Sequence, residues 1–315
     1  MKISKRTPLG CLDEGIMTVN FSRNGGLLLA AGISHARGRI WSWANESWDP
    51  ANSAEISQEN LSNLASSADG SKLAASPLTT TRLHVLDLPR LDGMKEMVFL
   101  KPPWKRSVAG HLLTSTIVNR LSFDPSGRFL ALADTCECSR ILDLETCECG
   151  ELTHPKAPVD FVKWTENGRE LISGSYLRLI TTDVKSGQVV DRLDLDDDEA
   201  WEHTTSPGSP DVFSVSSSGR IVFRDPKDGL IRRAELRLKP RLLTLAYSDG
   251  QRLLAIVRKD GLCLFWDVER WEPAGKTRIC SGEPTAIAFH PQRPYLAVAT
   301  GGLDNAPLVV IELER

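Results

Sequence analysis

Six segments of the chain share one pattern, in which a short apolar run, a polar turn and a second apolar run follow one another. The segments are VNFSRNGGLLLAAG, LASSADGSKLAAS, LSFDPSGRFLALAD, VKWTENGRELISGS, LAYSDGQRLLAIV and IAFHPQRPYLAVAT. Such short continuous apolar runs indicate β-strands that are covered on both faces. Asp-Gly or Asn-Gly pairs stand at 24–25, 69–70, 167–168, 249–250 and 260–261. These pairs are typical of tight hairpins, so the pattern predicts a series of antiparallel strand pairs.

An aromatic residue ends the first strand in most of these segments, and its spacing gives the length of a repeat. Phe21 holds this position in the first segment. Trp164 follows Phe123 by 41 residues, Tyr247 follows Trp164 by 83, or two repeats, and Phe289 follows Tyr247 by 42. A repeat of this length with about four strands is one blade of a β-propeller.

A column of acidic residues supports the same register, because a third strand follows each pair and ends in an acid. The column is Asp87, Asp143, Asp183, Asp225, Asp267 and Glu312. Its steps are 56, 40, 42, 42 and 45 residues, and the long step contains an insertion at 101–114. The first repeat has Trp43 in register and Ala44 in the acidic column, while the fifth has lost most of its turn signal. The two columns together indicate seven units.

We therefore predict an all-β fold, a single seven-bladed β-propeller of four-stranded antiparallel blades over residues 1–315. One small sheet with two apolar faces cannot bury itself, so neighbouring sheets must stack. The expected blades are 11–58, 59–100, 115–154, 155–195, 196–238, 239–280 and 281–315. The last of them has sequence for only three strands. We expect residues 1–10, chiefly MKISKR, to supply the fourth strand and close the last blade.

The best repeat, SDGQRLLAIVRKDGLCLFWDV, contains the polar turn, a second Asp-Gly and the pair Trp266-Asp267. In this it resembles the WD-repeat family, and the resemblance covers nearly the whole chain. The Gly-His element of that family is present as Gly110-His111 and, without the Gly, at His154. The resemblance implies a protein-interaction platform that binds partner segments on the face formed by the loops between blades.

Composition narrows the class of protein further. The 315 residues include 38 basic and 41 acidic ones, with a pI near 6.1, so bulk charge does not favour nucleic acid or anionic membrane. There is no apolar run long enough to span a bilayer, and the first residues do not read as a secretory signal. Seven cysteines without an export signal favour reduced thiols and a cytoplasmic location.

The stretch CECSRILDLETCEC at 136–149 contains four cysteines and suggests a zinc site. In the predicted register, however, a strand of about six residues separates Cys136 and Cys138 from Cys147 and Cys149. At ~3.3 Å per residue the two pairs would lie roughly 20 Å apart, too far for one ion with ~2.3 Å bonds. We expect thiols that occupy turns, although one Cys-x-Cys pair could still bind a soft metal or oxidise.

The main alternative function is a propeller enzyme of the lactonase or hydrolase type, acting on a small molecule in the central channel. Such enzymes gather carboxylates and histidines around a metal, but the innermost strands offer only Asp160 and Glu202, and hard cations prefer six or more oxygens. His203 stands in an otherwise apolar column, so we predict a buried, hydrogen-bonded imidazole. We therefore expect no catalytic residue, no metal and no cofactor.

Two loops between blades are candidate partner-binding segments. The first, KPPWKRSVAGHLLT, contributes Lys101, Trp104, Lys105 and Arg106. The second, DLDDDEAW, contributes Asp196, Asp197, Asp198 and Trp201. Trp and Arg are enriched at binding hot spots, and one basic and one acidic loop on one rim would suit a partner of mixed charge. Both loops could instead be solvated.

A third basic segment, IRRAELRLKPR at 231–241, falls on the fourth strand of the fifth blade. Edge strands commonly carry charge to prevent pairing between molecules, which we favour over nucleic-acid contact. We therefore predict a non-catalytic protein–protein interaction scaffold, a subunit or recognition module of a larger complex, that binds protein partners and neither nucleic acid nor membrane.

Overall fold

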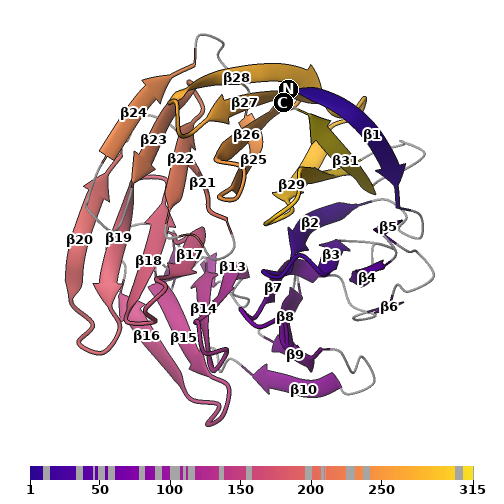
Figure 1. Cartoon of the computed structure of the whole chain (residues 1–315). Helices are drawn as coiled ribbons and strands as arrows, with labels where there is room; N and C mark the ends of the chain where they lie inside the picture. The colour runs from indigo at the N-terminus through magenta and orange to yellow at the C-terminus, as the bar shows by residue number, and fades with distance from the viewer. Residues whose placement is uncertain are drawn as a thin grey trace. The chain divides into compact units, whose positions relative to one another are not determined.

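The computed structural model describes most of the chain, and within the described residues all regular structure is β-strand (Figure 1). The described residues are 1–9, 15–32, 38–44, 47–48, 54–55, 61–77, 82–88, 94–99, 107–108, 111–112, 118–134, 138–153, 158–195, 201–206, 209, 211–224, 231–236, 242–301 and 308–314. They belong to two compact units. One unit contains Met1–Asn60 and Asp196–Arg315, and the other contains Leu61–Leu195.

The unit Leu61–Leu195 contains three four-stranded antiparallel sheets, in each of which the strands follow chain order. The first sheet is β7 (Leu61–Ser66), β8 (Lys72–Pro77), β9 (Arg82–Asp87) and β10 (Met94–Phe99). The second is β13 (Val118–Phe123), β14 (Phe129–Asp134), β15 (Cys138–Asp143) and β16 (Cys149–Thr153). The third is β17 (Phe161–Trp164), β18 (Glu170–Ser175), β19 (Arg178–Asp183) and β20 (Val189–Asp194). A short hairpin, β11 (Ser107–Val108) with β12 (His111–Leu112), lies between the first two sheets in sequence.

The other unit contains four sheets. The first is β2 (Ile16–Phe21), β3 (Leu27–Gly32) and β4 (Arg39–Ala44), and β4 also pairs with the short strands β5 (Ser47–Trp48) and β6 (Ala54–Glu55). The second is β21 (Trp201–Thr204), β22 (Val212–Ser216), β23 (Arg220–Arg224) and β24 (Ile231–Glu235). The third is β25 (Leu242–Ser248), β26 (Leu253–Arg258), β27 (Leu262–Asp267) and β28 (Glu272–Arg278). The fourth is β29 (Pro284–Phe289), β30 (Tyr295–Thr300) and β31 (Leu308–Glu314), completed by β1 (Lys2–Pro8).

The predicted closing strand is confirmed. β1 pairs antiparallel with β31, from Lys2 opposite Glu314 to Pro8 opposite Val309, so both ends of the chain belong to one sheet (Figure 1). Arg6 adds two hydrogen bonds outside this ladder, from Nη1 to the carbonyl of Ile279 (2.6 Å) and from Nη2 to that of Arg278 (2.9 Å). β1 is therefore anchored both to its own sheet and to the end of β28, at Arg278 and the following Ile279.

Stacking of sheets within each unit buries the middle strands on both faces, as the continuous apolar runs predict. Between the sheets of β2 and β29, Phe21 and Leu28 pack in one cluster with Ala297, Ala299 and Val310. The aromatic residues that end the first strands are all buried. The fourth strands β20, β24, β28 and β1 are largely exposed. Each of these four sheets therefore exposes one edge strand and buries the strands behind it.

Four of the five Gly pairs behave as expected, because Gly25, Gly70, Gly168 and Gly261 have positive φ angles between 67° and 77°. The Asp249-Gly250 turn is different. Here the positive φ falls on Arg252, at 51°. Gly250 is needed for space instead, because a Cβ there would lie 2.7 Å from the carbonyl oxygen of Pro291.

Candidate functional site

Most of the predicted partner-binding residues lie outside the described part of the chain. These are Lys101, Trp104, Lys105, Arg106, Asp196, Asp197 and Asp198. Trp201 is described: it begins β21, and its side chain is only 4% exposed. Of the two His positions of the family element, His111 lies in β12 and His154 is outside the described residues. The binding role of both loops remains a prediction.

The turns between first and second strands repeat one hydrogen-bonded design. It is seen at 22–27, 67–72, 124–129 and 165–170. In each, the N–H of the first residue donates to the carbonyl of the sixth, at 2.8–3.0 Å. The N–H of the sixth residue donates to the side-chain oxygen of the first, at 2.7–3.1 Å. A Ser, Asp or Thr at the start and a positive-φ Gly at the fourth position explain this geometry, since the oxygen accepts and the Gly permits the bend.

These turns also contact the turns of the neighbouring sheets within the same unit. Lys72 Nζ donates to the carbonyl of Gly127 at 3.0 Å, and His290 Nε2 bonds the carbonyl of Gly25 at 3.1 Å. Gln251 Nε2 donates to the carbonyl of Arg293 at 2.7 Å. Consecutive sheets are therefore joined through their first turns, and the polar groups of these turns serve the fold.

Two sheets add an ion pair between the turn and the acidic column found in the sequence. Arg128 bonds Asp143 Oδ2 at 2.6 Å, and Arg169 bonds Asp183 Oδ2 at 2.8 Å. The hydrogen bond from the arginine lowers the pKa of each aspartate to about 2. The acidic column therefore has a structural role in these sheets, as the anchor of the preceding turn.

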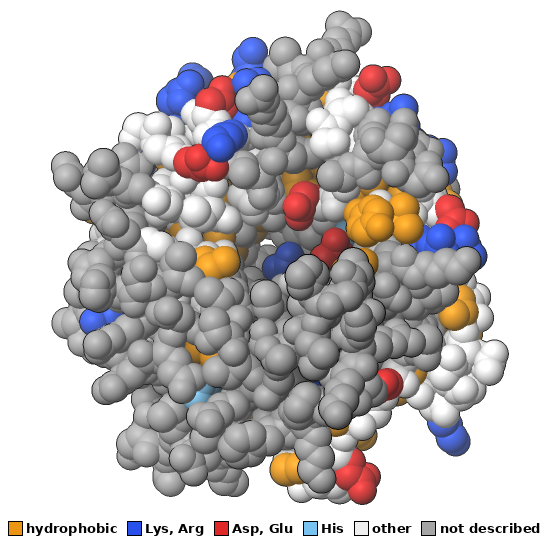
Figure 2. Space-filling model, turned by 180° about the vertical axis from the view of Figure 1, so that it is seen from behind, with side chains coloured by type: hydrophobic (Ala, Val, Ile, Leu, Met, Phe, Trp, Pro, Cys, Tyr) orange, Lys and Arg blue, Asp and Glu red, His pale blue; other side chains and the backbone are white. Residues whose placement is uncertain are grey.

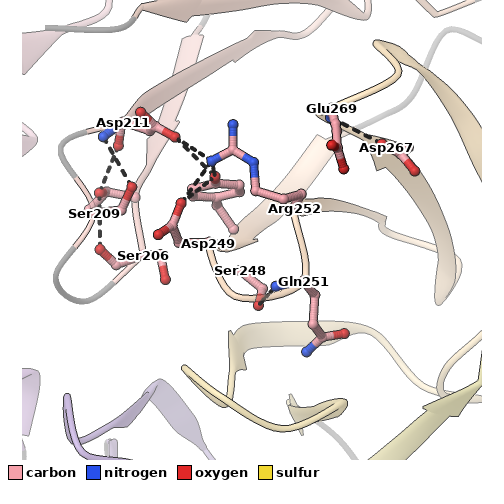
Figure 3. Close-up of polar contacts among 11 residues, drawn as sticks. Ser206, Ser209, Asp211, Ser248, Asp249, Gln251, Arg252, Asp267 and Glu269 are labelled. Atoms are coloured by element: carbon pink, nitrogen blue, oxygen red, sulfur yellow. Dashed lines mark hydrogen bonds and ion pairs between the residues drawn. The ribbon is translucent and has the colours of Figure 1, made fainter. Parts of the chain in front are cut away.

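Arg252 holds the same turn position in its sheet, but its side chain points elsewhere (Figure 3). With the positive φ moved onto Arg252 itself, its Nη1 donates to Tyr247 Oη at 2.7 Å, Asp249 Oδ1 at 2.8 Å and Asp211 Oδ2 at 3.0 Å. Asp211 directly precedes β22, a strand of the preceding sheet. Asp267, the member of the acidic column here, accepts hydrogen bonds from the backbone N–H groups of Glu269 and Arg270. Arg252 therefore connects two sheets, whereas Arg128 and Arg169 pair with an aspartate of their own sheet.

The hydrogen bonds and ion pairs of this cluster fix its side chains in place and do not activate them for a reaction. Tyr247 Oη lies 3.0 Å from Asp211 Oδ2 and from Asp249 Oδ1. Burial, and then the charges of the two aspartates, raise the pKa of Tyr247 above its usual range, so the phenol stays protonated. Asp211 is buried and paired with Arg252, whose side chain is 40% exposed. Sequence reasoning missed this bridge, and the only signal was a Tyr in a column otherwise filled by Phe and Trp.

Two histidines have clear structural roles. The prediction for His203 is confirmed, because its side chain is buried and Nδ1 bonds Ser214 Oγ at 2.8 Å. His290 is buried as well, and its Nδ1 accepts the N–H groups of Gln292 (3.1 Å) and Arg293 (2.9 Å). With Nδ1 accepting, the ring proton is on Nε2 and is donated to Gly25. A second proton on Nδ1 would turn this atom into a donor that faces two N–H donors, so both hydrogen bonds would be lost.

We expect His290 to make folding sensitive to mild acid. Burial, together with the charge of Arg293, lowers its pKa from 6.5 to about 4, although the Gly25 carbonyl opposes this. The unfolded chain therefore binds the proton first, so stability is complete above pH 6.5 and falls as the pH approaches 4. The loss should be on the order of 2 kcal/mol. Urea unfolding at pH 7, 5.5 and 4.5 measures it.

The matched variant for this test is His290→Gln, whose side-chain oxygen can accept but does not titrate. It should be less stable at pH 7 and show a flatter profile between pH 6.5 and 4. The aspartates with lowered pKa, such as Asp143, lose their contribution only below pH 3.8, outside this window. Equal slopes in the two proteins would contradict the assignment to His290.

On the face seen in Figure 2, the described charged side chains are of both signs. Figure 2 shows Lys and Arg side chains mixed with Asp and Glu side chains on the viewed face, as far as the residues are described. Across the same residues, no three His, Cys, Asp or Glu side chains are grouped so as to hold a metal ion. Nor does this part of the chain contain a helix that is long and apolar enough to cross a membrane.

Comparison with known proteins identifies the fold. No family model matches the chain, and no curated protein does. Among solved structures, the β-propeller domain of Cps50 (Swd1) from Myceliophteria thermophila matches with a TM-score of 0.78. The match has 13% identity and covers 99% of each chain. At that identity the likeness shows the fold alone: the chain is an all-β, seven-bladed β-propeller of four-stranded antiparallel blades, as the repeat columns predict.

Proposed function

We propose that this chain is a divergent member of the WD-repeat family and acts as a non-catalytic protein-interaction scaffold in a larger assembly. The fold is the shared propeller, and Trp266-Asp267 ends the third strand of the β25–β28 sheet as the family pattern requires. The similar solved structure supports the propeller fold. The repeat pattern of the sequence supports the proposed WD-repeat family.

The observation that carries this function is the use of the first turns. Their polar side chains are bonded within the turn or to a neighbouring sheet, as with Ser67, Asp124 and Arg252. Residues committed in this way cannot be changed freely to fit a partner. The connections from one blade to the next are not part of these turns, so their sequence can vary to fit a partner. They include the insertion at 101–114.

The insertion suits a contact surface by its chemistry. Trp104 provides a large rigid area, and Lys101, Lys105 and Arg106 provide donors and positive charge. The acidic run Asp196–Asp198 would attract basic residues of the same partner. Trp201 is buried at the start of β21, so its contribution would be to hold the end of the acidic loop. A protein segment of mixed charge is the ligand we propose.

A non-catalytic role is supported by the cluster around Arg252, whose polar groups are bonded to one another. Arg252 neutralises Asp211, and the phenol of Tyr247 is held protonated between two carboxylates. A general base or nucleophile needs an accessible reactive form, which this arrangement does not offer. The described cysteines are thiols rather than disulfides, which supports a reducing compartment such as the cytoplasm.

Affinity capture with the wild-type chain, followed by cross-linking, identifies the partner and allows a direct test. The double variant Trp104→Ala and Lys105→Glu should lower partner recovery at least tenfold, which corresponds to about 1.4 kcal/mol. Lys276→Glu on the exposed strand β28 is the control, since it makes the same charge change in a regular blade strand. Full recovery by a normally folded double variant would reject the insertion as the contact.

A further inference from the structure

The two cysteines of the second Cys-Glu-Cys motif differ from the other described cysteines. Cys147 and Cys149 are exposed, whereas Cys138, Cys263 and Cys280 are buried. The ladder of β15 with β16 places Cys149 opposite Leu142 and Cys138 opposite Thr153. Cys138 is thus at the far end of the strand, which confirms the predicted separation for this residue, while Cys136 lies outside the described residues. The pair Cys147 and Cys149 must be considered without it.

The turn that holds this pair is tightly fixed. The N–H of Cys147 donates to the carbonyl of Asp143 at 2.8 Å, and the N–H of Asp143 donates to the carbonyl of Glu148 at 2.9 Å. Asp143 Oδ1 also accepts the N–H of Glu145 at 2.9 Å, while its Oδ2 is held by Arg128. Both thiols therefore extend from a backbone with a defined shape.

Cys147 occupies a position that suits glycine. Its φ is 60°, and the same turn position, four residues after the acidic column, is Gly187 (φ 69°) in one sheet and Trp271 (φ 57°) in another. Packing accounts for the tryptophan, because the Trp271 ring contacts Trp266 and Phe223. The thiol of Cys147 is exposed, so packing does not offset its strained backbone. The side chain itself is the feature that needs an explanation.

We propose that Cys147 and Cys149 form a two-thiolate site for a soft monovalent metal ion, with Cu(I) as the best-fitting natural ion. Thiolates select Cu(I), and two opposed sulfurs satisfy it, whereas structural zinc needs four ligands. Binding forms two Cu–S bonds and releases two protons to solvent. The copper stays Cu(I), and no other reactant is consumed.

The surroundings of the pair favour a cation. Glu145 and Glu151 are exposed but paired with Arg128 and Arg140. Glu148 is exposed between the two cysteines, and its charge favours a cation and repels anionic thiol reagents. Cys147 lies in the turn before β16 and Cys149 is the first residue of that strand, so two residues of chain, at most ~7 Å, separate their Cα atoms. Two metal–sulfur bonds of ~2.3 Å on opposite sides of one ion can span sulfurs on residues this close in the chain.

The test titrates reduced, full-length protein with Cu(I) under anaerobic conditions in competition with bicinchoninate. The parent chain is the Cys136→Ser variant, which removes the other Cys-x-Cys pair. It should take one Cu(I) per chain from the chelator, and X-ray absorption should show two sulfur ligands. Cys149→Ser should weaken binding by at least ~10-fold.

Cys147→Gly is the decisive variant, because it removes one ligand and gives the turn the residue that Gly187 supplies in the β17–β20 sheet. It should lose Cu(I) binding while its urea midpoint stays equal or rises, so loss of binding cannot be loss of fold. Cys263→Ala, which removes a buried thiol, should bind as the parent does. Binding unchanged in Cys147→Gly, or too weak to compete with bicinchoninate in the parent, would overturn the proposal.

Discussion

Deleting residues 1–8 should lower the free energy of unfolding by roughly 4–8 kcal/mol, the largest effect we expect from any change described. The deletion removes the whole β1–β31 ladder and both hydrogen bonds from Arg6. It also uncovers the apolar surface on which Ile3 packs. Chemical denaturation of the full-length and shortened chains measures the difference.

Adding the missing strand in trans provides the control. A synthetic peptide of residues 1–9 should pair with β31 and restore most of the lost stability, since the ladder needs no covalent connection. A peptide of the same composition in scrambled order should not. An unchanged unfolding midpoint after the deletion would show that β1 does not support the last blade.

Gly25→Ala should be the second most damaging change, at roughly 3 kcal/mol. Gly25 has a φ of 72°, and a Cβ there would lie 2.4 Å from Cε1 of His290. The methyl group would therefore displace a buried ring that makes hydrogen bonds to Gly25, Gln292 and Arg293. The measurement is urea unfolding at pH 7.

Gly187→Ala separates backbone strain from displacement of the ring. Gly187 has a φ of 69°, and no atom lies within 4 Å of the place its Cβ would take. It should therefore cost only the left-handed backbone term, about 1 kcal/mol. Equal losses in the free energy of unfolding for Gly25→Ala and Gly187→Ala would show that the contact of Gly25 with His290 does not contribute to stability.

The sequence was sufficient for the fold because the repeat imposes the same requirement seven times. An aromatic residue such as Phe123 or Phe289 ends the first strand of most blades. In the structure this residue is buried where two sheets stack. The missing fourth strand of the last blade was equally visible, since β31 needed a partner and residues 2–8 formed the nearest unassigned strand. At these positions the local sequence pattern and the packing of the sheets favour the same structure.

The Arg252 bridge could not be predicted because it depends on one backbone angle. By sequence, Arg252 matches Arg128 and Arg169, which both bond the acidic column of their own sheet. A positive φ at Arg252 redirects the side chain to Asp211 in the neighbouring sheet, and no pattern of residue types encodes that direction. The proposed partner-binding loops have no repeat to constrain them, so their residues follow from chemistry alone.

Pairing of β1 with β31 also sets an order of events during synthesis. β1 emerges about 300 residues before its partner, which begins only at Leu308. At ~5–20 residues per second, β1 waits roughly 15–60 s for that partner. During this time it is an unpaired strand that could join another chain, and Lys2, Lys5 and Arg6 oppose this by charge. The same residues that close the last blade therefore protect the growing chain until β31 has been made.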